Sequence, residues 1–388
     1  MATIDKSLPN TMTEVEIPGE EEIVEAKEEA VEEISSDGKT EIEMDEEGGA
    51  TINFDPGEVN PEGGEDHDAN LADFLEDNVL DPLAAELMEH YRNYKESRQE
   101  WADSYREGLN LLGFKYVTRT EPFRGASSVT HPVLAEAVTQ FQAQAYKELL
   151  PADGPVRTQI LGALSVPKEE QSKRVKDFMN YQIMDQMKEY EPEFDQMLFY
   201  LPLSGSTFKK VYYDDLLGRA VSKFIPAEDL VVPYSATSLE DAEAVIHVIR
   251  MSPNDLRKQQ INGFYRDIDL GEPPVQEDKL KQKELELEGI QQNGTEDVYT
   301  ILEMHVDVDL EGHEDVNPED GEPTGIKLPY IITIDEANEK VLSIRRNYAP
   351  EDPLKKKKDY FVHFKFLPGL GFYGLGLIHM IGGLSRTA

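Results

Sequence analysis

The sequence predicts an α+β protein in which helices come first and strands follow. Apolar residues recur at helical spacing between residues 83 and 201, and from residue 208 onward short segments alternate apolar with polar residues. Residues 1–70 differ from both patterns, because they hold 23 Asp and Glu against three Lys without sustained periodicity. We expect this segment to be a disordered acidic arm.

Start and stop signals place the helices. A short helix is expected over 71–80, and a long one of about eight turns begins with Asp81 as N-cap and Pro82 in the first position and runs to Leu109. Further helices are expected from Pro132 to the Pro151 break, from 167 to 183, from 192 to the stop at Gly205, and from 253 to 261 with Ser252 as N-cap.

Alternating segments place the strands. They are 156–161, 208–213, 220–225, 244–251, 298–310, 327–335, 341–346 and 360–366. Residues 208–213 and 220–225 are expected to form a hairpin, and the last four segments one antiparallel sheet. These elements divide the chain into the arm 1–70, a helical and hairpin domain 71–265, a polar linker 266–295, a β-rich segment 296–366, and 367–388, the start of a helix at which we expect the chain to be truncated.

Composition narrows the classes of function. The 388 residues include 78 acidic and 38 basic side chains, a formal net charge of −40, and no cysteine, which excludes thiolate metal sites and fits a reducing cytoplasm. No window approaches twenty apolar residues, so we expect no membrane span. Such an acidic protein is poorly suited to gripping DNA phosphates, although an acidic surface would suit a channel through which DNA slides.

One cluster suggests metal chemistry. His305, Asp307 and Asp309 alternate along a predicted strand, with His313 and Asp315 close behind, and imidazole with carboxylates can bind a divalent cation. The alternative is that the same alternation makes them the solvent face of a strand whose residues Leu302 to Leu310 at even positions point inward. The sequence favours the alternative, because no second cluster offers further ligands.

Two other segments have competing interpretations. The glycines from Gly369 to Gly376 lack the Gly-Lys-Ser/Thr ending of a phosphate loop, so a hinge before a helix is favoured. Lys355, Lys356, Lys357 and Lys358 form a basic run that contacts DNA or a partner in one interpretation and is a solvated turn in the other.

Two stretches resemble a known family. Residues 121–162 read EPFRGASSVTHPVLAEAVTQFQAQAYKELLPADGPVRTQILG, a loop, a helix, an LLP break and a predicted strand, and residues 204–233 add a hairpin followed by the pattern Pro-x-x-Asp-hydrophobic-x-x-Pro. This order is similar to that in the N-terminal part of portal proteins of tailed bacteriophages, the head-to-tail connectors, particularly those of short-tailed phages of the P22-like type. The resemblance extends from about Leu71 to the end of the sequence.

The resemblance implies a function without catalysis and without a cofactor. It implies a homo-oligomeric ring of about twelve subunits at one capsid vertex, a conduit for double-stranded DNA during packaging and ejection. Expected partners are the terminase large subunit, head-completion or tail-adaptor proteins, and scaffolding or capsid proteins; the expected location is the virion, after synthesis in the bacterial host cytoplasm. Trp101, Arg124 and Phe141 are the residues expected in subunit packing.

Two rival functions stay open from the sequence. One is a metal-dependent hydrolase that uses His305, Asp307 and Asp309. The other is a monomeric acidic interaction protein in which the arm is the working part.

Overall fold

The computed structural model describes residues 41–44, 50–53, 67–112, 132–214, 217–273, 279–288, 298–316, 322–369 and 371–387. The chain divides into two units, 1–66 and 67–388, each described here by itself. In the first unit, β1 (Glu41–Met44) pairs antiparallel with β2 (Ala50–Asn53), a hairpin that the sequence analysis did not predict. The other residues of the predicted arm up to residue 66 lie outside the described ranges. In the second unit, helices and antiparallel sheets confirm the α+β class.

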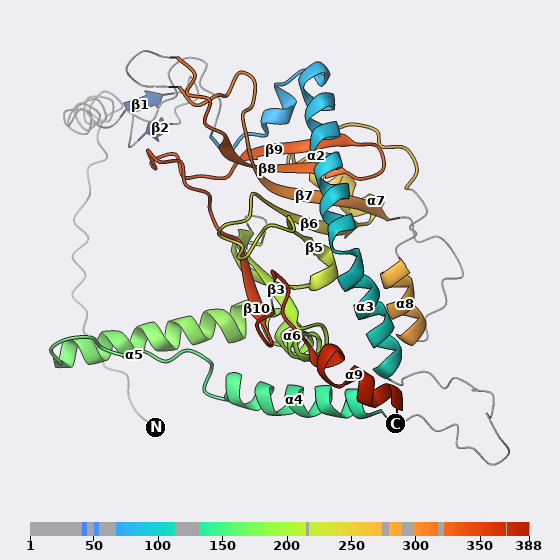
Figure 1. Cartoon of the computed structure of the whole chain (residues 1–388). Coiled ribbons are helices and arrows are strands. Elements are labelled where there is room, and N and C mark those ends of the chain that lie inside the picture. The colour runs from blue at the N-terminus through green and yellow to red at the C-terminus, as the bar shows by residue number, and fades with distance from the viewer. Residues whose placement is uncertain are drawn as a thin grey trace, which may run out of the picture. The chain divides into compact units, whose positions relative to one another are not determined.

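The second unit is built around a five-stranded antiparallel sheet (Figure 1). Its strands follow chain order: β5 (Leu230–Val231), β6 (Ala244–Met251), β7 (Tyr299–Val308), β8 (Leu328–Asp335) and β9 (Lys340–Arg346). Since β6 precedes residues 266–295 and β7 follows them, the predicted linker does not separate two sheets. Within it, the structure describes the short helix α8 (Lys279–Glu288).

A side chain from the start of this unit covers the outer edge of β9. The amide N–H of Ile344 donates to Oδ1 of Asn70 at 2.9 Å, and Nδ2 of Asn70 donates to the carbonyl oxygen of Leu342 at 3.3 Å. Asn70 therefore takes the place of a neighbouring strand, which protects an edge that would otherwise offer unpaired backbone groups. This contact begins the folded unit slightly before Leu71, and residues Leu71–Asp73 form one 3₁₀ turn in place of the predicted helix 71–80.

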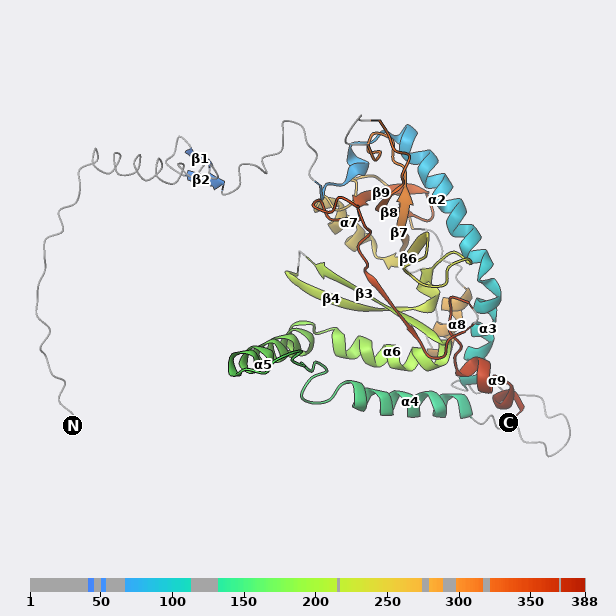
Figure 2. The ribbon, with the colours of Figure 1, turned by 60° about the vertical axis from the view of Figure 1, so that its left-hand side comes forward.

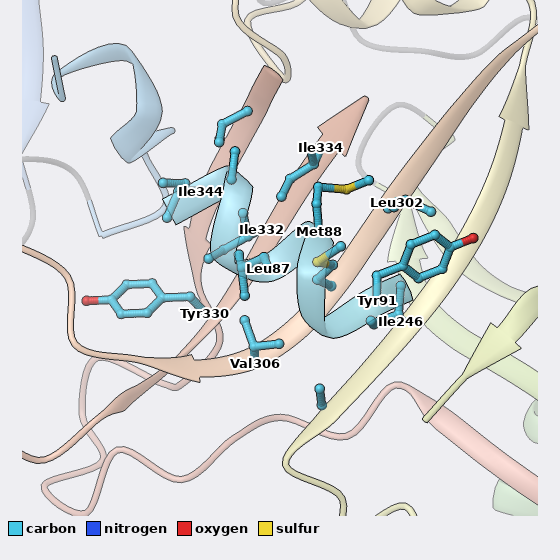
Figure 3. Close-up of a cluster of buried hydrophobic side chains, with 14 of the residues drawn as sticks. Leu87, Met88, Tyr91, Ile246, Leu302, Val306, Tyr330, Ile332, Ile334 and Ile344 are labelled. Atoms are coloured by element: carbon cyan, nitrogen blue, oxygen red, sulfur yellow. The ribbon is translucent and has the colours of Figure 1, made fainter. Parts of the chain in front are cut away.

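Helix α2 (Asp77–Ser97) packs across one face of the five-stranded sheet (Figure 3). Leu87, Met88 and Tyr91 are at most 6% exposed and pack with even-numbered residues of β7 such as Leu302. Even-numbered residues on β7 point to this face because side chains of a strand alternate between faces. The predicted inward direction of Leu302, Met304 and Val306 is confirmed.

The predicted long helix is two helices, and it begins earlier than expected. α2 is followed by α3 (Gln99–Leu109) with a break at Arg98, and Glu76, not Asp81, is the N-cap of α2, so Pro82 lies inside the helix. The break has a physical cause in the surroundings of Arg98. Its guanidinium group donates to the carbonyl oxygens of Ala227 (2.9 Å), Leu230 (2.8 Å) and Glu228, contacts that the apolar periodicity of α2 and α3 does not reveal.

A three-stranded antiparallel sheet lies beside the first sheet in the order β10 (Phe361–Lys365), β3 (Ser206–Asp214), β4 (Arg219–Pro226). The predicted hairpin is confirmed, with Phe208 opposite Ile225. The prediction that 360–366 joins the same sheet as β7, β8 and β9 is wrong, because β10 pairs with β3. Alternation identifies a strand but not its neighbour, and residues 347–360 carry the chain from one sheet to the other.

Helix α6 (Tyr190–Ser204) covers the three-stranded sheet through contacts with β3 and β4, and α4 (Val133–Leu149) and α9 (Leu377–Thr387) pack against α6 (Figure 2). Helix α9 also contacts α3 and α4. α7 (Pro253–Ile261) has the predicted N-cap, since Oγ of Ser252 accepts from the N–H of Asp255. α5 (Val166–Tyr181) is followed by a π-helical turn, Gln182–Gln186.

The predicted strand 156–161 is wrong. These residues run along α5 without strand pairing, held by side-chain contacts with it. The side chain of Asn180 binds both backbone groups of Val156. Its Oδ1 accepts from the N–H of Val156 at 2.9 Å, and its Nδ2 donates to the carbonyl oxygen of Val156 at 3.2 Å. The hydroxyl group of Ser172 donates to Oγ1 of Thr158 at 2.8 Å. Residues 157–159 are all exposed, so the alternation in the sequence does not correspond to a strand with one buried face.

Candidate functional site

The predicted metal ligands do not form a metal site. Nε2 of His305 lies 2.8 Å from Oε1 of Glu303, while Asp307 and Asp309 lie further along the chain and are exposed. In the described ranges, no group of three or more His, Asp or Glu side chains is arranged to hold a metal ion. The alternative prediction, that these residues form a solvent face, is also wrong at His305, whose side chain is 9% exposed.

Glu303 and His305 belong to a buried polar cluster between the two sheets. Nζ of Lys210, on β3, lies 2.6 Å from both carboxylate oxygens of Glu303, and the two side chains are 14% and 15% exposed. Burial raises the pKa of Glu303, but the charge of Lys210 and the hydrogen bond with His305 outweigh it, so the pKa is held well below its usual value. The carboxylate is therefore ionised and already paired, which leaves little of it for a metal ion.

Two neutral histidines complete the cluster. His247 lies directly opposite Glu303 in the β6–β7 ladder, and burial lowers its pKa to about 3. Its Nδ1 has no hydrogen-bond partner among the described residues. Burial likewise lowers the pKa of His305, whose ring centroid is 4.9 Å from that of Phe361 in an edge-to-face arrangement. This cluster joins the two sheets and is enclosed by aromatic rings, as a structural ion pair would be.

A small cavity adjoins the cluster but does not suit a substrate. It has a volume of about 30 Å³ and is lined by His305, Asn347, Tyr360 and Phe361, among others. Such a volume holds roughly one or two water molecules, whereas substrate pockets are typically on the order of 300–1,000 Å³.

The basic run 355–358 forms part of a turn, and two of its four side chains contact other residues of the chain. Nζ of Lys355 lies 2.5 Å from Oδ1 of Asp315, and Nζ of Lys357 donates to the carbonyl oxygens of Leu239 and Glu240. Lys356 and Lys358 are exposed. Two exposed lysines at one turn are a modest electrostatic feature, so the prediction that this run contacts DNA or a partner stays a prediction.

The glycine-rich segment is a close backbone crossing. A Cβ atom on Gly374 would lie 2.4 Å from the carbonyl oxygen of Gly205, and one on Gly376 would lie 2.3 Å from that of Leu203. The N–H of Gly374 donates to Oγ of Ser206 at 2.7 Å. The glycines thus allow two chain segments to touch, which explains them without a phosphate and differs from the free hinge that the sequence favoured.

Trp101 and Phe141, two of the three residues expected in subunit packing, have partners within the chain. The ring of Trp101 stacks on those of Tyr105 and Tyr373, with centroids 5.7 and 4.7 Å away. Phe141 packs edge-to-face on Phe366 at 5.2 Å. Arg124 lies outside the described residues. The structure therefore gives Trp101 and Phe141 an internal packing role.

Among the described residues, one uncovered apolar surface belongs to α5 and the residues before it, where the sequence predicted a helix over 167–183 without indicating an exposed apolar face. None of the residues of α5 is buried. Val175, Phe178 and Met179 share one face, at spacings of three and one, and are 44%, 58% and 41% exposed. Figures 1 and 2 both show α5 projecting beyond the other helices of this unit.

A weak signal in the sequence could have indicated this surface. The apolar face formed by Val175, Phe178 and Met179 is narrow, and seven of the sixteen residues of α5 are charged. A helix with so many charged residues can bury only a small part of its surface in a hydrophobic core. By contrast, α6 contributes Phe194, Met197 and Leu198 to a buried cluster.

Within the described ranges, none of the helices combines the length and the apolar composition that crossing a bilayer requires. Comparison of the sequence with models of known protein families found no match, and neither did comparison with curated proteins.

Proposed function

We propose that this chain is a non-catalytic subunit of a portal-like ring at a capsid vertex. The ring would conduct double-stranded DNA and provide the docking surface for the terminase motor and for head-completion or tail proteins. The sequence resemblance over residues 121–162 and 204–233 suggests the family, and its helix and hairpin occur in the fold as α4 and as β3 with β4.

The observation that carries the proposal is the uncovered apolar surface of α5. A helix with an exposed Phe, Val and Met on one face is typical of a subunit that completes its packing on another chain. The apolar residues of α5 are exposed, whereas the polar groups of the Lys210–Glu303–His305 cluster are enclosed between two sheets. The excess of negative charge is compatible with a conduit, since a sliding polyanion is not held by an acidic wall.

The test is negative-stain electron microscopy of the protein expressed from its complete reading frame. Ring-shaped particles with a central channel and about twelve subunits are expected. Monodisperse particles of single-chain size at every concentration would refute the proposal.

A second preparation separates this function from that of an acidic interaction protein. Residues 67–388 form a compact unit of their own, so the protein without residues 1–66 can be purified and imaged in the same way. A portal-like subunit is expected to form the same rings without the arm, whereas an interaction protein whose working part is the arm would lose its binding.

A further inference from the structure

The apolar surface at α5 consists of the stripe Val175, Phe178 and Met179 together with three residues that precede or open the helix. Leu161, Leu164 and Val166 are 85%, 70% and 68% exposed. We call these six residues the α5 surface. Six large apolar side chains that are 41–85% exposed present on the order of several hundred Å². That is comparable to one partner's share of a small specific interface.

The α5 surface is not covered by the segment that runs along the helix. Residues 156–164 hold α5 through polar contacts of Ser172 and Asn180, side chains that are partly buried. Val175, Phe178 and Met179 stay 44%, 58% and 41% exposed with this segment in place, so the segment does not cover them. In proteins, most of the stability of a helix comes from packing of its apolar face. The described part of this chain does not supply that packing.

The charges around the surface indicate the chemistry of its occupant. α5 carries four basic side chains, Lys168, Lys173, Arg174 and Lys176, against three acidic ones. Residues 67–388 as a whole carry 56 acidic and 35 basic side chains. The helix thus has a net charge of +1 on a unit whose net charge is −21, and the surface that it fits by charge complementarity is that of another acidic unit of the same kind.

We propose that the α5 surface docks on the acidic body of a second copy of this chain. The contact joins different surfaces of the two copies, so it is head-to-tail, and repetition of such a contact closes a ring when the rotation permits. The inference rests on the proposed function and deepens it, by assigning the projecting helix and the segment before it to the contact between neighbouring subunits.

The experiment compares Phe178→Ser with Phe74→Ser in the full chain. Phe178 and Phe74 are 58% and 61% exposed, so neither substitution should disturb the fold of the single chain, and circular dichroism checks this. Mass photometry and sedimentation velocity then measure assembly. Loss of a buried aromatic contact should weaken each subunit contact at least tenfold in Phe178→Ser, whereas Phe74→Ser should assemble like the wild type.

A charge variant tests the acidic partner. Arg174→Glu on α5 should weaken association, and the wild-type assembly should weaken as salt is raised from low to high concentration. Association that is unchanged in Arg174→Glu and insensitive to salt would remove the charge argument.

The outcomes separate this inference from the proposed function. Rings that form equally well in the wild type and in Phe178→Ser would overturn the inference and leave the proposed function standing. Small assemblies without rings, dissolved by Phe178→Ser, would support the inference and refute the ring. A wild type that is monomeric throughout would overturn both, as would a monomer that binds vesicles of anionic lipid through Phe178.

Discussion

Replacement of Gly374 by alanine tests whether the glycine-rich segment is a packed crossing or a free hinge. An added Cβ would lie 2.4 Å from the carbonyl oxygen of Gly205 and 2.7 Å from that of Leu367. Both neighbours are backbone atoms, so no side-chain rotation relieves the overlap. The two chain segments must instead move apart.

The cost follows from two contributions. Forcing an extra methyl group into a packed site costs about 1–3 kcal/mol. Separating the segments also weakens the hydrogen bond from the N–H of Gly374 to Oγ of Ser206, now 2.7 Å long, which contributes about 1 kcal/mol. We expect the free energy of unfolding of Gly374→Ala to fall by about 2–4 kcal/mol.

Urea denaturation measures this change, and the chain provides a matched control three residues away. No described atom lies within 4 Å of a Cβ added at Gly371, so Gly371→Ala should change stability by less than about 0.5 kcal/mol. The expected result is a lower midpoint for Gly374→Ala with an unchanged slope. Equal midpoints for the two variants would show that the segment is free to adjust, and the packed crossing would then be refuted.

Three further predictions concern buried charge. Burial lowers the pKa of Lys209 from 10.5 to about 8, and its Nζ has no hydrogen-bond partner among the described residues, so Lys209→Met should stabilise the protein at pH 7 by about 1 kcal/mol in thermal or urea unfolding. Because the unfolded chain binds that proton more tightly, the advantage of Lys209→Met should shrink as pH rises from about 8 toward 10; a constant advantage would contradict the assignment. Glu303→Gln leaves Lys210 buried without its partner charge and should cost about 3–5 kcal/mol, most of which should return when Lys210→Met is added; a double variant no more stable than the single one would contradict the ion pair. Burial lowers the pKa of His247 to about 3 and also lowers that of His305, so folding stability should be full above the unfolded value near 6.5 and decline as pH falls toward 3, by about 1–3 kcal/mol more in the wild type than in His247→Asn. Equal acid profiles for the two proteins would contradict the buried neutral state of His247.

Elements with strong local signals were predicted well. The strand 244–251, the hairpin around residues 214–218 and the helix capped by Ser252 occur as β6, β3 with β4, and α7. In each of these the decisive information lies within a few residues, such as the hydroxyl of Ser252 that accepts from the N–H of Asp255.

The wrong predictions have non-local causes. The break between α2 and α3 depends on Arg98 and carbonyl groups about 130 residues away, and the sheet that β10 joins depends on pairing with residues about 155 positions earlier. The candidate metal site was wrong for the same reason. His305 contacts Glu303, whose carboxylate pairs with Lys210 from another sheet, while Asp307 and Asp309 stay exposed.

The distribution of polar and apolar groups is compatible with the proposed function. An active site usually presents titratable groups in a cavity of substrate size and keeps large apolar side chains covered. In the described part of this chain, the best-connected titratable cluster, around Glu303, is sealed between two sheets beside a cavity of about 30 Å³. Phe178 and its neighbours on α5 are among the large apolar side chains left exposed. Burial of the α5 surface on another chain would remove this apolar area from water, which is favourable in free energy. This favours a protein that works by assembly.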